Sequence, residues 1–441
     1  MSTPTRQLHL AAFLQGVNHT TVWSDPAAGS QTDFASFEHM ARTAERGTFD
    51  FFFLAEGLRL REQKGRIHDL DVVGRPESIA VLAALAAVTE RLGLAATVNT
   101  TFNEPYELAR RFATLDHLSG GRAGWNIVTS SDAFTGANFR RGGYLEHAHR
   151  YSRAAEFTEV ARQFWDSWPT GAAAPDEVVH TGPQFDVRGH ANVARSPQGH
   201  PVIIQAGDSG EGRDFAAATA DVIFTRHSHL AAGQAFVADI RERARTAGRP
   251  EGAITVMPAV SWVLGSTAEN AEERAREIRL QQVTPATAIA FAEQVWNTDL
   301  SDHDPDGALP TFEPRSEGEV SEGRAATKRL DRAAVSQQWR DLARTEGLTL
   351  RETAAEMSSH QSFVGTAEQI ADEMLRFLDA DAADGFVLTP HINPGGLDDF
   401  VDEVVPVLRE RGRFRTEYTG TTLRDHLGIP VPAPRRPAEV S

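Results

Sequence analysis

The sequence of 441 residues contains no cysteine, and this absence removes several classes of protein at once. Without thiols the chain forms no disulfide scaffold, thiolate zinc site, iron–sulfur cluster or cysteine nucleophile. Long apolar segments are also missing. The longest uninterrupted apolar run, Ile79–Val88, is far shorter than the roughly 20 residues that a membrane-spanning helix needs. Met1–Gln7 lack the pattern of a signal peptide, so we expect a cytoplasmic protein.

The chain also has fewer basic than acidic residues. The chain has 44 Lys and Arg residues against 61 Asp and Glu residues, and its formal net charge is −17. Because attraction to nucleic-acid phosphates requires a concentrated positive surface, this balance argues against a nucleic-acid partner. Apolar residues make up 41 % of the chain, which is long enough for one large domain or two to three small ones. We therefore expect an acidic globular protein.

Eight short apolar segments, rich in β-branched or aromatic residues, recur along the chain and predict strands. Most are apolar on consecutive residues, which is typical of parallel strands that are covered on both faces. The segments are Leu8–Gln15, Phe49–Ala55, Leu92–Asn99, Ala123–Thr129, Pro201–Gly207, Asp221–Thr225, Ile254–Leu264 and Gly385–Pro390.

Helical patterns alternate with these strands, and Asp33 is the expected N-cap of the first. Strands and helices in regular alternation predict a single (β/α)8 TIM barrel over residues 1–441. An open doubly wound sheet is the alternative, and eight regular repeats favour the barrel over it. The helical patterns cover Phe34–Arg46, Glu77–Arg91, Tyr106–Leu118, Glu146–Trp165, Gly212–Ala220, Ala231–Ala247, Thr366–Leu378 and Leu397–Glu410.

Two regions fall outside this repeat. Residues 266–360, between the seventh and eighth strands, are too many for one helix, so we expect an insertion. Its middle, Asp299–Arg324, is polar, charged and broken by Pro and Gly, and fits either a lid over the barrel mouth or a plain surface loop. In the C-terminal segment 412–441, the proline-rich run Pro430–Pro437 predicts an extended tail on the surface or across a partner subunit.

Carboxylates are scarce at the carboxyl ends of the predicted strands, where a barrel carries its active site. Glu56 is the one obvious carboxylate there, whereas a glycosidase needs two that face each other. The pairs His147/His149 and His227/His229 have no carboxylate at a supporting spacing, so we expect no metal site. The strand ends instead carry hydrogen-bonding and aromatic residues: Asn18, His19, Trp23, Thr97, Asn99, Thr100, Thr101, Trp125, Asn126, Thr129, Ser130 and His391.

Neither GxxxxGK[ST] nor a strand-turn-helix GxGxxG occurs, but the turn Gly207–Gly212 joins the fifth strand to a helix. Backbone N–H groups at such a turn can hold a phosphate, with the Ser209 hydroxyl as an additional donor. Tight turns of this kind are also glycine-rich for steric reasons alone. His147 and Tyr151 share one helix face and could reach the same anion, or could simply pack against the barrel. Both interpretations stay open on the residues alone.

Five stretches together resemble the flavin-dependent monooxygenases of the bacterial luciferase-like superfamily. The resemblance is strongest to the branch that contains nitrilotriacetate monooxygenase component A, EDTA monooxygenase and dibenzothiophene-sulfone monooxygenase. It extends over nearly the whole chain. The stretches are FDFFFLAEG (Phe49–Gly57), NEPYELARRFATLDHLSGGRAGWNIVTS (Asn103–Ser130), HAHRYSRAAEF (His147–Phe157), SPQGHPVIIQAGDSGEGRDFAA (Ser196–Ala217) and RERGRFRTEYTGTTLRDHLGIP (Arg409–Pro430).

The resemblance implies a two-component enzyme that acts on a small organic substrate without a metal. A separate NAD(P)H:FMN reductase would supply reduced FMN (FMNH2), O2 would be the cosubstrate, and a flavin C4a-(hydro)peroxide would insert one oxygen atom. The outcome would be C–N or C–S cleavage or heteroatom oxidation, in a homodimer or homotetramer. The alternatives are a deazaflavin-dependent dehydrogenase of the same superfamily, a non-flavin barrel hydrolase and a non-catalytic flavin-binding relative.

The resemblance also implies where the flavin lies. It places the ring near Glu56, Thr97 and Asn126, although the family usually has Asp at the position of Glu56. It places the phosphate near Tyr151 and the turn residues, with His147 alongside; these turn residues are Gly207, Ser209 and Gly210.

His19 corresponds to a histidine that the family places in its substrate pocket, and we take His19 and Asn126 as the catalytic candidates. A polyaminocarboxylate substrate would favour a positive pocket, although solvated surface positions explain its possible arginines equally well. These arginines are Arg59, Arg61, Arg140 and Arg141.

Overall fold

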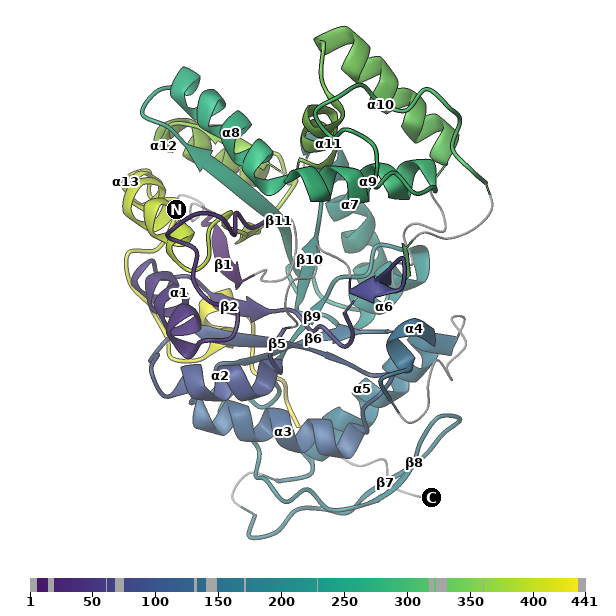
Figure 1. Ribbon diagram of the computed structural model, residues 1–441. Coiled ribbons are helices and arrows are strands. Elements are labelled where there is room, and N and C mark those ends of the chain that lie inside the picture. The colour runs from purple at the N-terminus through teal and green to yellow at the C-terminus, as the bar shows by residue number, and fades with distance from the viewer. Residues whose placement is uncertain are drawn as a thin grey trace.

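Within the residues that the structure describes, eight parallel strands close into a ring at the centre of the molecule (Figure 1). Each pairs with the next in the order β1–β2–β5–β6–β9–β10–β11–β14, and β14 pairs back with β1. The ring confirms the (β/α)8 barrel, and the open sheet is wrong. The strands are β1 (His9–Leu14), β2 (Phe51–Leu54), β5 (Gly93–Asn99), β6 (Ala123–Val128), β9 (Val202–Gln205), β10 (Val222–Thr225), β11 (Thr255–Leu264) and β14 (Gly385–Leu388). The computed structural model describes residues 6–14, 20–60, 62–67, 75–130, 133–139, 149–169, 172–227, 229–316, 321–322, 331–359 and 361–434.

The predicted helices surround the ring, with shifts of a few residues at their ends. The pattern over 77–91 yields a helix that ends at Ala86, and the Glu77 carboxylate caps its start by accepting from the Ala80 N–H at 2.7 Å. Asp33 precedes α1 in an extended conformation but makes no side-chain cap. The helices are α1 (Phe34–Arg46), α2 (Ser78–Ala86), α3 (Pro105–Leu118), the short α4 (Ala133–Gly136), α5 (Arg150–Asp166), α6 (Gly210–Thr219), α7 (Leu230–Thr246), α12 (Ala367–Asp379) and α13 (Val405–Glu410), which the turns η3 (Gly395–Leu397) and η4 (Phe400–Val404) precede.

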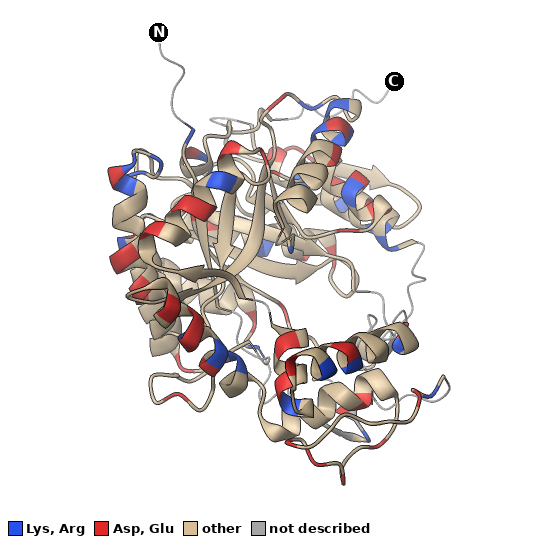
Figure 2. Cartoon of the chain, turned by 90° about the horizontal axis from the view of Figure 1, so that it is seen from above, with Lys and Arg blue, Asp and Glu red and all other residues tan. Residues whose placement is uncertain are grey.

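Alternating side chains on each strand build two apolar layers. On β2, Phe52 and Leu54 pack outward against the helices, whereas Phe51 and Phe53 fill the barrel interior. Figure 2 shows charged residues gathered on the surrounding helices and nearly absent from the barrel strands. No helix in the described part of the chain is long and apolar enough to cross a membrane.

The described residues of the region 266–360 contain four helices beside the barrel mouth. The last three share an apolar core of their own around Trp296 and Trp339, whereas the first packs Ala275 and Ile278 against Val263 of β11. The end of β11, Ser261–Leu264, leads into the insertion and pairs with strand β13 (Gln361–Gly365), which follows the insertion in the chain. The helices are α8 (Ala268–Gln282), α9 (Pro285–Trp296), α10 (Arg332–Glu346) and α11 (Leu350–Ser358).

The segment Asp299–Arg324 contacts a distant loop. Its residues 299–316 have no regular secondary structure, but β12 (Ser321–Glu322) pairs with β3 (Glu62–Gln63), which in turn pairs with β4 (Arg66–Ile67). The ammonium group of Lys64, between β3 and β4, donates to Glu293 and, at 2.6 Å, to Asp299. The role of this segment as a lid stays a prediction.

Two further elements differ from the sequence expectations. Residues 412–434 are not extended throughout, because α14 (Leu423–Leu427) begins with a capping box at Thr422 and inserts Leu423 and Leu427 into the barrel interior. A hairpin, β7 (Val178–Thr181) and β8 (Asp186–Gly189), lies between α5 and β9 in the chain and was not anticipated.

Candidate active site

A cavity of about 860 Å³ opens at the carboxyl ends of the barrel strands. Its apolar floor is an aromatic cluster in which the rings of Phe13 and Phe53 meet edge to face at 4.8 Å and those of Phe53 and Phe224 stack at 5.6 Å. Its outer wall includes Ile278 and Gln282 of α8. Strand ends and insertion thus share one cavity, and its volume suits a cofactor-sized ligand.

Two neighbouring strands bring Thr97 and Asn126 together at the cavity wall. The two residues are in register on β5 and β6, and the Asn126 amide Nδ2 donates to the Thr97 hydroxyl at 3.0 Å. Both side chains are buried, and the Asn126 Oδ1 atom has no partner among the described residues. Since an unpaired buried acceptor is costly, this oxygen is placed to accept from a ligand N–H or O–H.

Glu56 follows β2 and lines the same cavity. The amide of Asn99 donates to both of its carboxylate oxygens, each at 3.0 Å. Burial raises the pKa of Glu56 to about 7, although the Asn99 hydrogen bonds oppose this shift. The carboxyl group is therefore divided between its neutral and charged forms near neutral pH.

The turn Gly207–Gly212 starts beside Ala206, a residue of the cavity lining. Ser209 is the N-cap of α6 and accepts from the Gly212 N–H at 3.2 Å, while its hydroxyl lies 3.4 Å from the Tyr151 hydroxyl of α5. A Cβ atom on Gly212 would lie 2.6 Å from the Tyr151 oxygen, and one on Gly207 would lie 2.9 Å from the Gly212 Cα. Gly210 has open space around it. Close approach therefore requires glycine at 207 and 212 but not at 210.

The acidic residues of this turn are balanced by arginines. Asp208 pairs with Arg213 at 2.8 Å, and Glu211 lies 3.6 Å from the guanidinium of Arg150. The Arg150 guanidinium also lies over the Tyr151 ring, 4.4 Å from its centroid. Two hydroxyls, the N-terminus of α6 and a buried arginine thus meet at one spot, which is the environment that a phosphate group prefers.

Sequence reasoning missed Arg150, although its position next to Tyr151 was a usable signal. It also missed Arg75, Arg226 and Gln282, which come from loops and from the insertion and line the cavity. His391, noted at the end of the eighth strand, lines it too, and burial lowers the pKa of this histidine.

Arg59, one of the predicted arginines, lines the cavity. Arg59 donates to the Phe134 carbonyl at 2.7 Å and pairs with Glu62 at 2.8 Å, so its guanidinium is already engaged. Among the described residues, no group of three or more His, Asp or Glu side chains could hold a metal ion. Six residues singled out in the sequence lie outside the described residues, and their roles stay predictions: Asn18, His19, His147, Arg61, Arg140 and Arg141.

The closed barrel and the cavity at its carboxyl ends define a (β/α)8-barrel protein with its site in the position typical of barrel enzymes. A family model described as luciferase-like monooxygenase matches residues 16–383, and the chain belongs to this family. N-acetyl-S-(2-succino)cysteine monooxygenase of Bacillus subtilis (strain 168) is 40 % identical, with 99 % of each chain covered. Nitrilotriacetate monooxygenase component A of Aminobacter aminovorans is 40 % identical over 97 % of each chain. Dibenzothiophene-sulfone monooxygenase of Rhodococcus erythropolis (strain XP) is 39 % identical over 98 % of each chain.

Solved structures agree with these relatives. EDTA monooxygenase (EmoA) from Chelativorans sp. BNC1 is 31 % identical with a TM-score of 0.73, covering 96 % of this chain and 99 % of that one. Riboflavin lyase (RcaE), solved with modified FMN and riboflavin, is 31 % identical with a TM-score of 0.76, covering 96 % of each chain. The predicted family is confirmed, and a monooxygenase is favoured over the dehydrogenase and the hydrolase. The chain is an enzyme of the oxidoreductase class.

Proposed function

We propose that this chain is the oxygenase component of a two-component system. It takes reduced FMN from a separate NAD(P)H:FMN reductase and uses O2 to place one oxygen atom in a small organic substrate. The printed name "component A" of one relative and the modified FMN in one neighbouring structure support the proposal. The observation that carries it is the Tyr151–Ser209 contact in the turn that follows Ala206, a residue of the cavity lining.

The residues present fit FMN at two separate points. The hydroxyls of Tyr151 and Ser209, together with the first N–H groups of α6, would bind the phosphate. At the other end, Asn126 Oδ1 would accept from an N–H of the flavin ring, while Thr97 holds the Asn126 amide in place. When bound, the flavin supplies the electrons and the reactive atom for oxygen chemistry.

The chain's own contribution is to exclude water and manage protons. The aromatic floor of Phe13, Phe53 and Phe224 keeps the inner cavity apolar. Glu56, with its pKa near 7, can hold or release a proton at the cavity wall. We keep His147 as a further phosphate ligand and His19 as a proton donor or acceptor in the substrate space.

The relatives suggest a panel of substrates that differ in charge. N-acetyl-S-(2-succino)cysteine and nitrilotriacetate carry carboxylates, whereas dibenzothiophene sulfone carries none, and one relative is named for each. Product formation from this panel with a partner reductase distinguishes C–N cleavage, C–S cleavage and heteroatom oxidation. Light scattering on the purified chain distinguishes the homodimer or homotetramer that we expect from a monomer.

The direct test mixes the purified chain with photoreduced FMN under anaerobic conditions and then admits oxygen. We expect a transient near-ultraviolet absorption that differs from the spectrum of oxidised flavin. A decay identical to that of a control without protein contradicts the proposed function. A matched control with oxidised FMN shows that the signal requires the reduced cofactor.

A further inference from the structure

Arg226 follows strand β10 and differs from the other two arginines of the described cavity lining. Arg59 donates to the Phe134 carbonyl and pairs with Glu62, and Arg75 also has an interaction partner. Arg226 is exposed, and it forms no hydrogen bond or ion pair with any residue that the structure describes. Its guanidinium group is therefore available to a ligand of the cavity.

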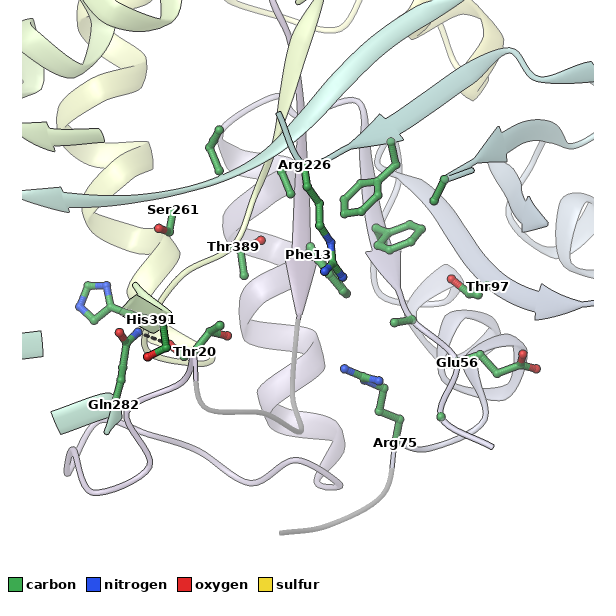
Figure 3. A pocket seen from close by; sticks show the side chains of 18 of the residues that line it. Phe13, Thr20, Glu56, Arg75, Thr97, Arg226, Ser261, Gln282, Thr389 and His391 are labelled. Carbon is green, nitrogen blue, oxygen red and sulfur yellow. Dashed lines mark hydrogen bonds between the residues drawn. The ribbon is translucent and has the colours of Figure 1, made fainter. Parts of the chain in front are cut away.

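The turn after β10 directs Arg226 into the cavity. The backbone N–H of His227 donates to the Thr225 hydroxyl at 3.2 Å, which holds the turn closed. The His227 Nε2 atom lies 3.7 Å from Asp208, so the outer side of this turn contacts the turn that we propose as the phosphate site. Figure 3 shows Arg226 extending inward beside Phe13, over the aromatic floor.

The carboxylates nearest to this turn and in the described cavity lining are engaged elsewhere. Glu56 receives hydrogen bonds of 3.0 Å on both of its oxygens from Asn99, and in Figure 3 it lies on the side of Thr97 rather than beside Arg226. Asp208 is paired at 2.8 Å with an arginine of α6. Neither carboxylate forms an ion pair with Arg226, so its positive charge remains for a bound molecule.

The FMN position proposed above brings the flavin ring to this guanidinium. We expect a flavin that reaches from the Ser209 hydroxyl to Asn126 Oδ1 to have its ring over the aromatic floor, where Arg226 also lies. The oxidised ring is neutral, whereas a ring that has taken up an electron pair and a single proton carries a negative charge. Because a bound flavin displaces water from an apolar floor, a positive charge there distinguishes the two redox forms strongly.

We infer that Arg226 is a cofactor-binding residue that pairs with the negative charge of the reduced flavin ring and makes the chain bind reduced FMN more tightly than oxidised FMN. A guanidinium offers paired N–H donors, which suit the adjacent nitrogen and carbonyl acceptors of the ring that carry this charge. The phosphate cannot supply this selection, because its charge is the same in both redox forms. The assignment rests on the proposed function and adds to it the residue that selects the redox state.

The test measures binding rather than turnover. Anaerobic titrations give the dissociation constants of oxidised and reduced FMN, and the ratio of the two, for the wild type, Arg226→Met and Arg226→Lys. Two variants serve as controls: Ser209→Ala removes a proposed phosphate ligand, and Arg276→Met removes an exposed arginine of α8 outside the cavity lining. Circular dichroism melting curves establish that each variant is folded.

We expect the ratio of the oxidised to the reduced dissociation constant to fall about tenfold in Arg226→Met, which loses a charge-assisted hydrogen bond to one form alone. The midpoint potential of bound FMN should fall by about 30 mV, because a tenfold change in a two-electron equilibrium constant corresponds to this shift. Arg226→Lys should keep most of the ratio, since it keeps the charge. Ser209→Ala should weaken the binding of both forms by the same factor, and Arg276→Met should match the wild type.

Two results overturn the assignment: a wild type that binds both forms of FMN equally, or the same ratio in the wild type and in Arg226→Met. An equal loss of affinity for both forms belongs to the second result and would make Arg226 a ligand of the phosphate. Failure of the proposed function appears separately. A wild type that binds neither form overturns both proposals, whereas a missing transient absorption, with a ratio that still depends on Arg226, overturns the proposed function alone.

Discussion

The two sides of the cavity are built in different ways. On the β5–β6–β9 side, Thr97, Asn126 and the turn Gly207–Gly212 stand on or directly after barrel strands, and neighbouring strands hold them in register. On the insertion side, Gln282 ends α8, which packs against Val263 at the far end of β11, and the helices that follow have a separate core around Trp296 and Trp339. The first side is a rigid frame suited to a constant cofactor. The second is an addition that can vary with the substrate without disturbing the barrel.

The largest expected effect is on the cofactor side, at Gly212. Gly212→Ala places a Cβ 2.6 Å from the Tyr151 hydroxyl and 3.0 Å from the Gly207 Cα, so Tyr151 must move away from Ser209. We expect the binding of reduced FMN to weaken by about 2 kcal/mol, as in other overpacked sites. Anaerobic titration followed by flavin fluorescence or absorbance measures this change.

Gly210→Ala is the matched control for that variant, because the same methyl group meets open space at position 210. Alanine also favours the helix more than glycine does, so neither variant should unfold α6. If both variants bound reduced FMN with equal affinity, the glycine turn would not be part of the FMN site.

Removing one hydroxyl at a time should cause a smaller loss of affinity for reduced FMN. Tyr151→Phe and Ser209→Ala should each weaken reduced-FMN binding by about 1 kcal/mol, since each would remove a single one of the proposed hydrogen bonds to the phosphate. Binding of the substrate panel to the loaded enzyme should not change, which separates the two sides of the cavity. Unchanged FMN affinity in both variants would show that the phosphate binds elsewhere.

Glu56 should make the cofactor side sensitive to pH. Because burial raises its pKa from 4.5 to about 7, its charge appears as the pH rises through 7 and then opposes the binding of an anionic cofactor. Glu56→Gln should therefore retain, at pH 8, a reduced-FMN affinity a few-fold higher than that of the wild type, and the two should agree near pH 6. Parallel pH profiles for the two proteins would contradict this role.

The raised pKa of Glu56 also affects the stability of the chain without cofactor. A carboxyl group with a raised pKa in the folded state stabilises the protein below its unfolded pKa and loses this contribution as the pH rises through the folded value. Between about pH 4.5 and 7, the free energy of unfolding should fall more steeply for the wild type than for Glu56→Gln. Denaturant titrations across this range measure the difference.

The smallest expected effect concerns the insertion side. Lys64 donates to Asp299 at 2.6 Å and to Ser301 at 2.9 Å, and so connects the loop after β2 to the segment that we expect to act as a lid. Lys64→Met should increase hydrogen exchange in residues 299–316 several-fold and shorten the transient absorption, with little change in FMN affinity. Exchange and lifetime like those of the wild type would argue for a plain surface loop.

The same contrast between the two sides explains what the sequence could predict. The barrel was predictable because each strand is a short apolar run, and the turn Gly207–Gly212 because its three glycines lie within six consecutive residues. The capping box of α14, Thr422 with Asp425, is a local signal for a helix start. It would have placed a helix in the expected tail.

The features that the sequence did not predict depend on tertiary structure. β12 pairs with β3 across some 260 residues of chain, and no local pattern records such a pairing. The pKa of Glu56 depends on burial by neighbouring elements and on Asn99. Arg226 reads in the sequence as a surface arginine, and only the turn held by Thr225 directs it into the cavity.

A crystal structure of the chain with FMN, grown in the presence of nitrilotriacetate, tests the central assignment most directly. We expect the phosphate within hydrogen-bond distance of the Tyr151 and Ser209 hydroxyls and a ring N–H that donates to Asn126 Oδ1. Clear density for the phosphate at any other position, with those two hydroxyls unengaged, would contradict it.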